Sequence, residues 1–395
     1  MLKASQLTSQ SLHTLPDIAS SWSRLAVSQG HGMNATLRPS TNRHEDHAAI
    51  DLLTERTIEV LQQAHHSSNR SRAIAHSIAA ISSGAAKARV SCSELFSVLA
   101  DVATKRATDF RPQALTTMAW SLATVGHDAP ATFDAIAAST AAKLDELRRP
   151  HLSVLAWSFA LADHPSALFD SRFVDKCNGI SWRRDDQPDL TRLHQWQLWH
   201  EERGVEKPLA PGLAARCLSA MSSTRVQTSW MQTDVGHALR EIGMEPEAEV
   251  RTPEGYRLDF VIHVDGERVG IEVDGPNHFV ANTILSTAST HLKHRQLCRL
   301  SSLRTLIIPY FRWNETGHTL GRKRRYLKLL VQSFRDGSAE ASGVAVDALS
   351  RRPRTLSRTE REALRAGRRD ATSETTILGK KAHPPCHPSR VLCNS

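Results

Sequence analysis

The stretch from Leu258 to Phe279 reads LDFVIHVDGERVGIEVDGPNHF and predicts a β-hairpin. At its centre, Asp265-Gly266 suits a type I′ turn, because both central residues of that turn need positive φ. A two-residue loop then pairs apolar residues with apolar residues on one face: Leu258 with Val273, Phe260 with Ile271, and Ile262 with Val269. A slip of one residue would set Phe260 against Glu272 and reverse every match, so the pattern favours this register.

The other face of the predicted hairpin gathers three carboxylates. Asp259 lies directly opposite Glu272, and Asp274 is diagonal to Asp259. Opposed side chains in an antiparallel pair have Cβ atoms about 5 Å apart, where two carboxylates repel unless a cation or a shared proton intervenes. The three acids, and His278 in the rigid turn that follows, are therefore candidate functional residues.

Length and charge limit what the whole chain can be. A chain of 395 residues predicts two or three domains. The 50 Lys and Arg outnumber the 41 Asp and Glu, and the pI of about 9.5 favours a polyanionic partner such as nucleic acid. No run approaches the roughly eighteen apolar residues that span a bilayer, so we expect a soluble protein with no membrane partner. The six cysteines lack paired spacing and indicate neither a disulfide framework nor a zinc ribbon.

Residues 46–235 predict helical repeats. They are rich in Ala, Leu and Ser and lack strand alternation, and two segments recur with a period of 37: FRPQALTTMAWSLAT at 110–124 and LRRPHLSVLAWSFAL at 147–161. Such periods are typical of helical-hairpin solenoids, because one hairpin alone cannot bury its apolar face. We expect Trp120 and Trp157 to pack between hairpins. Further copies are suggested at 74–102 and 193–199, and the solenoid would present a concave basic surface to extended RNA.

Both ends of the chain have compositions that predict disorder. The first 43 residues are Ser-rich and basic with Asp17 as their single acid, which is also typical of a transit peptide for mitochondria or chloroplasts. Residues 1–45 are therefore interpreted as disordered, with a transit peptide as the functional alternative. Residues 351–395 contain eleven Lys and Arg against four acids, and residues 336–395 predict a disordered basic tail.

The charge changes sign after the hairpin. Residues 245–290 carry nine acids and three Lys or Arg, whereas residues 291–328 carry ten Lys or Arg and one acid. The second stretch predicts a basic helix from Thr290, a buried strand at 303–309 and a last basic helix. Basic residues interleaved with exposable aromatics favour a single-stranded nucleic acid site, because cations neutralise phosphates and rings stack on bases. The candidate RNA-binding residues are His278, Lys293, Arg295, Arg299, Tyr310, Arg312, Trp313, Arg322 and Lys323.

A structural alternative remains open for the same residues. In it, Tyr310 and Trp313 pack in the core, and the charges form a solvated face.

Three ordered motifs in this region resemble the RAP domain, an RNA-binding module abundant in apicomplexans. They are EVDGPNHF at 272–279, THLKHR at 290–295 and IIPYFRWN at 307–314, and the resemblance covers residues 258–330. The 37-residue hairpins resemble the octatricopeptide-type repeats that often accompany this domain. The resemblance implies an organellar protein, mitochondrial rather than chloroplast by preference, that binds RNA and acts in RNA processing, stability, ribosomal RNA maturation or translation.

RAP domains are also similar to restriction-endonuclease-like folds, and this similarity implies a second function. In that fold an Asp and a Glu/Asp-x-Lys motif hold a divalent metal that activates water for phosphodiester attack. Asp259 and Glu272 match the metal-binding pair, while Asp274 stands at the Lys position. In a nuclease these three acids would be catalytic with Mg²⁺ or Mn²⁺, and RNA binding alone would require no cofactor. In the structural alternative Asp274 caps the following turn and His278 is a packed or hydrogen-bonded histidine.

The sequence therefore predicts an α plus α/β protein. Solenoid-like helical hairpins occupy 46–235, and a small restriction-endonuclease-like α/β RAP domain occupies 236–335 with its core at 258–330. The leading hypothesis is an organellar RNA-binding protein whose partner is a single-stranded organellar transcript or ribosomal RNA. The alternatives are a metal-dependent endoribonuclease and a protein-interaction scaffold.

Overall fold

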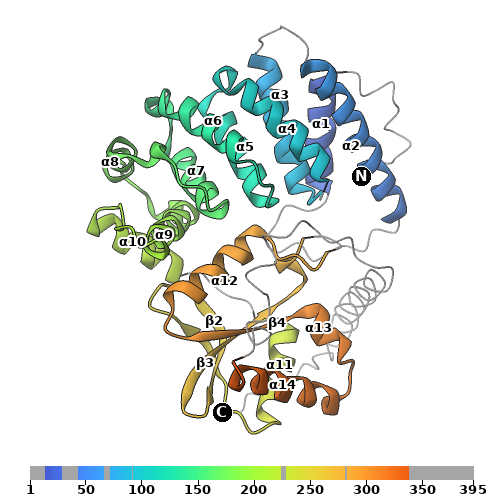
Figure 1. Cartoon of the computed structure of the whole chain (residues 1–395), viewed down its shortest axis with the longest axis vertical. Helices are drawn as coiled ribbons and strands as arrows, with labels where there is room; N and C mark the ends of the chain where they lie inside the picture. The colour runs from blue at the N-terminus through green and yellow to red at the C-terminus, as the bar shows by residue number, and fades with distance from the viewer. Residues whose placement is uncertain are drawn as a thin grey trace, which may run out of the picture.

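An arc of paired helices leads into a small sheet with helices on both faces (Figure 1). The computed structural model describes residues 14–28, 43–65, 72–90, 92–223, 228–280 and 283–337. The helices of the arc are α1 (Leu15–Ser28), α2 (Arg43–His65), α3 (Arg72–Lys87), α4 (Ser93–Lys105), α5 (Pro112–Thr124), α6 (Pro130–Ala141), α7 (Arg149–Leu161), α8 (Ser171–Gly179), α9 (Gln187–Glu202) and α10 (Pro211–Ser222). The odd-numbered helices α1 to α9 stack in chain order, and α2, α4 and α6 form a second row. The predicted fold class, helical repeats followed by an α/β domain, is confirmed.

Helices α5 and α7 each have a proline in the first turn, and their stop residues lie 37 positions apart, as the repeat predicts. Pro112 and Pro150 lie in the first turns, where a missing N–H costs nothing because those donors have no partner inside the helix. The residues that stop these helices, Gly126 and Asp163, adopt left-handed φ values of +66° and +50°. This conformation is costly for a residue other than glycine. Asp163 is held there because its Oδ1 accepts a hydrogen bond from Trp199 Nε1 of α9 at 2.7 Å.

The repeated tryptophans lie between neighbouring helix pairs, as predicted. Trp120 and Trp157 are half-buried and pack against the core of the arc. The indole N–H of Trp157 donates to Gln195 Oε1 of α9 at 2.7 Å, which joins two successive pairs. The suggested further copies are present as the pair α3 and α4 and the pair α9 and α10.

Helix α1 corrects the prediction that residues 1–45 are disordered. Ile18 and Trp22 lie one turn apart and are fully buried, and Trp22 Nε1 donates to Thr57 Oγ1 of α2 at 3.0 Å. Gly84 of α3 permits this contact, because a Cβ built there would lie only 2.6 Å from Trp22 Cβ. Composition missed the helix because four serines interrupt its short apolar stripe. The segments on either side of α1 lie outside the described residues.

The predicted hairpin forms two strands of a four-stranded sheet. The strands are β1 (Glu247–Arg251), β2 (Arg257–Val264), β3 (Glu267–Asp274) and β4 (Arg304–Pro309), in that spatial order. The first three are antiparallel, and β4 runs parallel to β3 after the crossover helix α12 (Ala288–Leu300). Helix α12 lies between the sheet and the arc, whereas α11 (Trp230–Arg240), α13 (Tyr310–Glu315) and α14 (Leu320–Arg335) lie on the other side of the sheet (Figure 1).

The hairpin register is confirmed over most of its length. Asp265 and Gly266 have φ values of +53° and +86°, as a type I′ turn requires. The pairs Phe260 with Ile271 and Ile262 with Val269 form as predicted. The third predicted pair, Leu258 with Val273, does not form, and the pairing ends at Phe260. The backbone N–H of Val273 donates instead to Asp259 Oδ2 at 2.7 Å.

The boundary between the two parts lies earlier in the chain than predicted. A division at 235/236 would cut α11, but Val235 and Leu239 of that helix pack in the same core as Ile262 and Leu306 of the sheet. The arc ends with α10, so the division falls between residues 223 and 228. At the other end, α14 stops at Arg335, next to the predicted boundary. The predicted basic tail lies outside the described residues beyond residue 337.

Candidate functional site

The three predicted carboxylates gather at one end of the sheet, where β2 begins and β3 ends. Asp259 is held by two donors: the Val273 N–H reaches Oδ2 at 2.7 Å, and the Gln232 amide of α11 donates to Oδ1. Glu272 and Asp274 follow each other on the same face of β3 and are almost completely buried, with 2% and 1% of their surface exposed. The structure therefore brings the three acids to one end of the sheet, although the pairing of β2 with β3 ends at Phe260 and does not include the predicted pair of Asp259 with Glu272.

Lys293 of α12 compensates the charge of Glu272. Its Nζ lies 2.6 Å from Glu272 Oε2 and donates to the carbonyl oxygen of Arg257 at 3.1 Å. Glu272 Oε1 has no hydrogen-bond partner. Burial raises the pKa of Glu272 to about 8, because the attraction of Lys293 only partly offsets desolvation. Burial alone would lower the pKa of Lys293, but the attraction of Glu272 and Asp259 outweighs it and raises that pKa.

Two imidazoles approach Asp274. His278 Nδ1 lies 3.3 Å from Oδ1, and His294 Nε2 of α12 lies 3.2 Å from Oδ2. Neither carboxylate oxygen has a hydrogen bond of good geometry. His278 Nδ1 is also 3.2 Å from the Thr290 hydroxyl, and 42% of its side chain is exposed. Burial lowers the pKa of His278, with the attraction of Asp274 acting in the opposite direction.

These contacts do not fit the predicted metal pair. A divalent ion held by Asp259 and Glu272 needs free carboxylate oxygens. Both oxygens of Asp259 accept protein hydrogen bonds, and the ammonium of Lys293 pairs with Glu272. Across the described part of the chain, no group of three or more His, Cys, Asp and Glu side chains is arranged to hold a metal ion.

The basic helix α12 faces inward, which corrects the prediction that it presents Lys293 and Arg295 to RNA. Arg295 is 4% exposed, and its Nη2 lies 2.7 Å from Glu202 Oε1 of α9 and 2.8 Å from the Ala160 carbonyl oxygen of α7. The side chain of Glu202 is completely buried. Burial raises the pKa of Glu202 against the opposing effect of Arg295. Lys293 and Arg295, two of the three Lys and Arg of α12, are thus committed to internal carboxylates.

A hydrogen-bond network continues the contact between the arc and the sheet. Tyr256 OH donates to Gln296 Oε1 of α12 at 2.6 Å and accepts from Gln195 Nε2 of α9 at 3.1 Å. Gln296 Nε2 donates to the Gln195 carbonyl oxygen at 2.9 Å. Helix α12 contacts α5, α7 and α9. The inner side of the arc is therefore occupied there by the protein itself, and the predicted concave surface is not free to receive RNA along these helices.

The predicted stacking aromatics are core residues. Tyr310 and Trp313 of α13 are 2% and 1% exposed. Trp313 Nε1 donates to Asp234 Oδ2 of α11 at 2.8 Å, and Lys323 of α14 pairs with the same carboxylate at 2.7 Å. The Lys323 Nζ also lies 5.6 Å from the centre of the Trp313 ring. Packing and ion pairing already use these side chains, so the structure favours the alternative in which Tyr310 and Trp313 pack in the core and Lys323 forms an internal ion pair.

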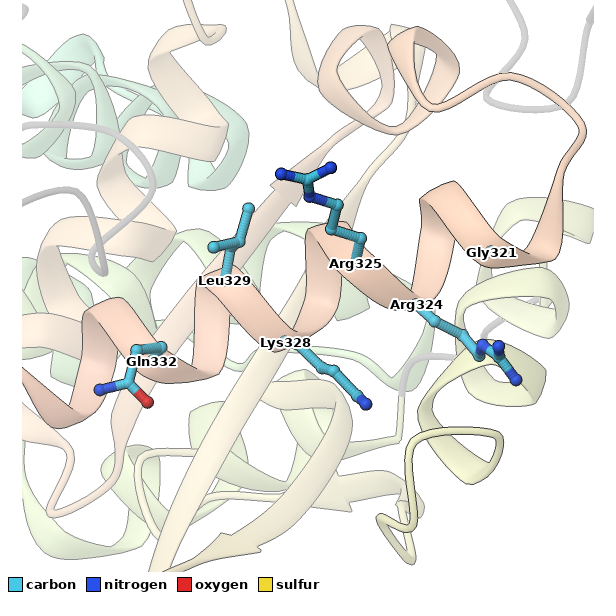
Figure 2. Close-up of a pocket in the computed structure, with 6 residues that line it drawn as sticks. All are labelled: Gly321, Arg324, Arg325, Lys328, Leu329 and Gln332. Atoms are coloured by element: carbon cyan, nitrogen blue, oxygen red, sulfur yellow. The ribbon is translucent and has the colours of Figure 1, made fainter.

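Exposed positive charge gathers on the outward face of α14. The helix carries six Lys and Arg and no acid between Leu320 and Arg335. A shallow groove on this face is lined by Gly321, Arg324, Arg325, Lys328, Leu329 and Gln332 (Figure 2). Arg322, Arg325 and Lys328 are exposed and form no ion pair with any described residue, whereas Arg324 lies 3.8 Å from Glu241. We call the exposed residues Arg322, Arg324, Arg325 and Lys328 the α14 cationic face.

The structure does not bring the remaining predicted residues to one surface. Arg299 is exposed on α12, on the side of the sheet opposite to α14. Arg312 is exposed on α13 and pairs with Glu315 at 3.1 Å. Of the predicted RNA-binding residues, Arg322 lies on the α14 cationic face. His278 stays at the acidic end of the sheet.

Sequence reasoning missed the partners that neutralise the buried cations. Glu202 and Gln232 lie far along the chain from the residues they contact, and nothing in the local pattern distinguishes them from surface residues. His294 could have been identified from the sequence, because it stands in the THLKHR motif one helical turn after Thr290. That Arg324, Arg325 and Lys328 are exposed together can be known only once the buried face of α14 is known.

Residues 271–330 match the family model of the RAP domain. This range begins in β3 and ends in α14, so it includes α12, β4 and the α14 cationic face. A search of curated proteins found no match. Among the helices that the structure describes, none has the length and apolar character needed to cross a membrane.

Proposed function

Because residues 271–330 form a RAP domain, we propose that this chain is an organellar RNA-binding protein and that single-stranded RNA lies across the α14 cationic face. The RAP domain suggests an RNA-binding role, and this match is the observation that carries the proposal. The finer statement, that the RNA is an organellar transcript or ribosomal RNA whose processing, stability or translation is affected, follows from the resemblance to this family.

Charge availability supports α14 as the contact surface. A phosphate ligand needs cations that are exposed and not already neutralised. Lys293, Arg295 and Lys323 fail this condition because each pairs with a buried or partly buried carboxylate. Arg322 and Lys328 meet it, and the aliphatic side chain of Leu329, 61% exposed, gives a base an apolar surface to contact.

Salt-dependent binding tests the proposal. Each phosphate contact on single-stranded nucleic acid contributes about −0.7 to the slope of log K against log salt. Loss of Arg322, Arg325 and Lys328 should reduce the magnitude of that slope by about 2 and weaken binding by at least roughly tenfold. Fluorescence anisotropy with a labelled oligoribonucleotide measures both quantities.

A matched control removes comparable charge from the arc. Lys87 of α3 and Arg111 before α5 are exposed, and they lie outside the RAP domain. The variant K87A/R111A should bind RNA with the affinity of the wild type, whereas R325A/K328A should bind RNA more weakly. Equal losses for the two double variants would contradict α14 as the contact surface.

The organellar address is part of the proposal and rests on the family resemblance and on the basic, Ser-rich N-terminal segment. Because α1 packs in the core of the arc, we propose that any cleaved leader ends before Leu15. N-terminal sequencing of the protein recovered from organelles tests this. A mature terminus beyond α1 would contradict it, because Trp22 would be lost from the core.

A further inference from the structure

One tryptophan is exposed on the side of the sheet that carries the α14 cationic face. Every Phe, Tyr and Trp of the chain lies within the described residues, and among these side chains only Trp230 is exposed, with 45% of its surface accessible. Tyr310 and Trp313, the rings that the sequence suggested for stacking, are buried. Base stacking needs an accessible ring face. Trp230 is therefore the aromatic residue that is available for it.

The first turn of α11 holds Trp230 away from the core. The buried stripe of this helix packs in the core of the sheet and consists of Met231, Val235 and Leu239. Trp230 is the first residue of the helix and lies off this stripe. The Ser229 hydroxyl caps the helix by accepting a hydrogen bond from the Gln232 N–H at 3.1 Å. The indole thus projects from a fixed backbone, which lowers the entropy that a bound ligand must cost.

An ion pair joins α11 to the first turns of α14. Asp234 of α11 accepts hydrogen bonds from the Lys323 ammonium at 2.7 and 2.9 Å. Trp230 lies four residues before Asp234, so the two share a helix face. Leu320 lies three residues before Lys323 and shares a face of α14 with it. The two helices are in contact and lie side by side (Figure 1). Trp230 is therefore next to the end of α14 at which the cationic face begins.

Apolar and cationic side chains are interleaved on this surface. Seven large apolar side chains are exposed in the described part of the chain, and three of them lie on α11 and α14: Trp230, Leu320 and Leu329. Arg322 and Arg325 stand between the two leucines along α14 and are exposed. Proteins that bind single strands combine cations for the phosphates with rings for the bases. This combination favours a nucleic acid strand as the ligand that covers Trp230.

We propose that Trp230 stacks on a base of the bound single strand while the α14 cationic face contacts its phosphates. This inference rests on the proposed function and adds a base contact from outside the matched residues 271–330. Every base has a π-face, so stacking adds affinity with little sequence preference.

Binding of a normal and an abasic chain tests the stacking contact. Fluorescence anisotropy compares a labelled oligouridylate with an abasic oligoribonucleotide of the same length. Trp230→Ala should weaken binding of the oligouridylate by at least about fivefold, because loss of a stacking ring typically has this effect. The variant should bind the abasic chain like the wild type. Its slope of log K against log salt should be unchanged, because no cation is lost.

Two variants serve as controls. Trp230→Phe keeps an aromatic ring and should retain most of the affinity. Val205→Ala removes an apolar side chain of the arc that is 52% exposed, and it should leave binding unchanged. If Trp230→Ala does not fold, tryptophan emission decides the question. Oligouridylate should quench the emission of the wild type more than that of Trp230→Phe, and equal quenching would contradict the proposal.

The results separate this inference from the proposed function. A folded Trp230→Ala variant that binds oligouridylate as tightly as the wild type would overturn the stacking contact, even if R322A/R325A/K328A binds weakly. An equal loss of affinity for the abasic chain would also overturn it. Unchanged affinity in R322A/R325A/K328A would instead refute α14 as the contact surface, and with it the arrangement proposed here.

Discussion

Replacing Arg295 with Ala should destabilise the protein strongly and leave RNA affinity unchanged in the molecules that remain folded. Arg295 makes two contacts to Glu202 Oε1, at 2.7 and 2.9 Å, and one to the Ala160 carbonyl oxygen at 2.8 Å. Its loss leaves the buried carboxylate of Glu202 without its ion-pair partner. Breaking a buried ion pair in this way costs about 3–5 kcal/mol. The unsatisfied carbonyl adds about 1 kcal/mol or more.

The double variant E202Q/R295M distinguishes the stability cost of an unpaired buried carboxylate from the cost of lost packing. It removes the uncompensated carboxylate, and replacement of a whole buried pair by neutral residues is often close to neutral in stability. We therefore expect its unfolding midpoint to lie well above that of R295A. Urea denaturation followed by tryptophan fluorescence compares the variants, and anisotropy with labelled RNA at fixed salt measures affinity.

The result that would refute this reasoning is a stable R295A protein with weakened RNA binding. That combination would mean that Arg295 is exposed to RNA in solution and that α12 is not clamped between the arc and the sheet.

Three further predictions concern single residues. Burial, and then the charge of Arg295, lowers the pKa of His291 from 6.5 to about 4, so the folded state favours the neutral ring. The folded state is destabilised as pH falls from 6.5 toward 4, because the unfolded chain then binds the proton more readily, and the loss is on the order of 3 kcal/mol. H291Q should flatten this part of the curve of unfolding midpoint against pH. Gly84→Val should cost about 1–3 kcal/mol in urea unfolding by forcing α1 from α3, whereas no loss would show that α1 does not pack there. Trp313→Phe should lower Tm by removing the hydrogen bond to Asp234 while leaving RNA affinity intact, and an affinity loss without a Tm change would restore the stacking hypothesis.

The local part of the C-terminal domain was readable from sequence. Alternation in the hairpin and the Asp265-Gly266 turn specify strand register, because the side-chain period is two and the turn needs positive φ. The same pattern places Glu272 beside Asp274 on one face. The 37-residue period likewise gave the helix pairs, since Gly126 and Asp163 repeat the same stop conformation.

The sequence could not show which side chains of the basic helices are buried and which are exposed. Lys293 and Arg322 both lie in helices rich in Lys and Arg, so local composition does not distinguish the two residues. Only the docking of α12 against the arc, through contacts such as Arg295 with Glu202 across 93 positions of the chain, buries the first and leaves the second exposed. Long-range pairing of this kind leaves no local periodic signal.

Crosslinking of bound RNA tests the central claim most directly. The full chain is irradiated with a single-stranded oligoribonucleotide, and the modified peptides are identified by mass spectrometry. The account predicts that crosslinks concentrate in α14, between Leu320 and Arg335, and disappear in R322A/R325A/K328A. Crosslinks concentrated in α12, between Ala288 and Leu300, that persist in this variant would contradict it.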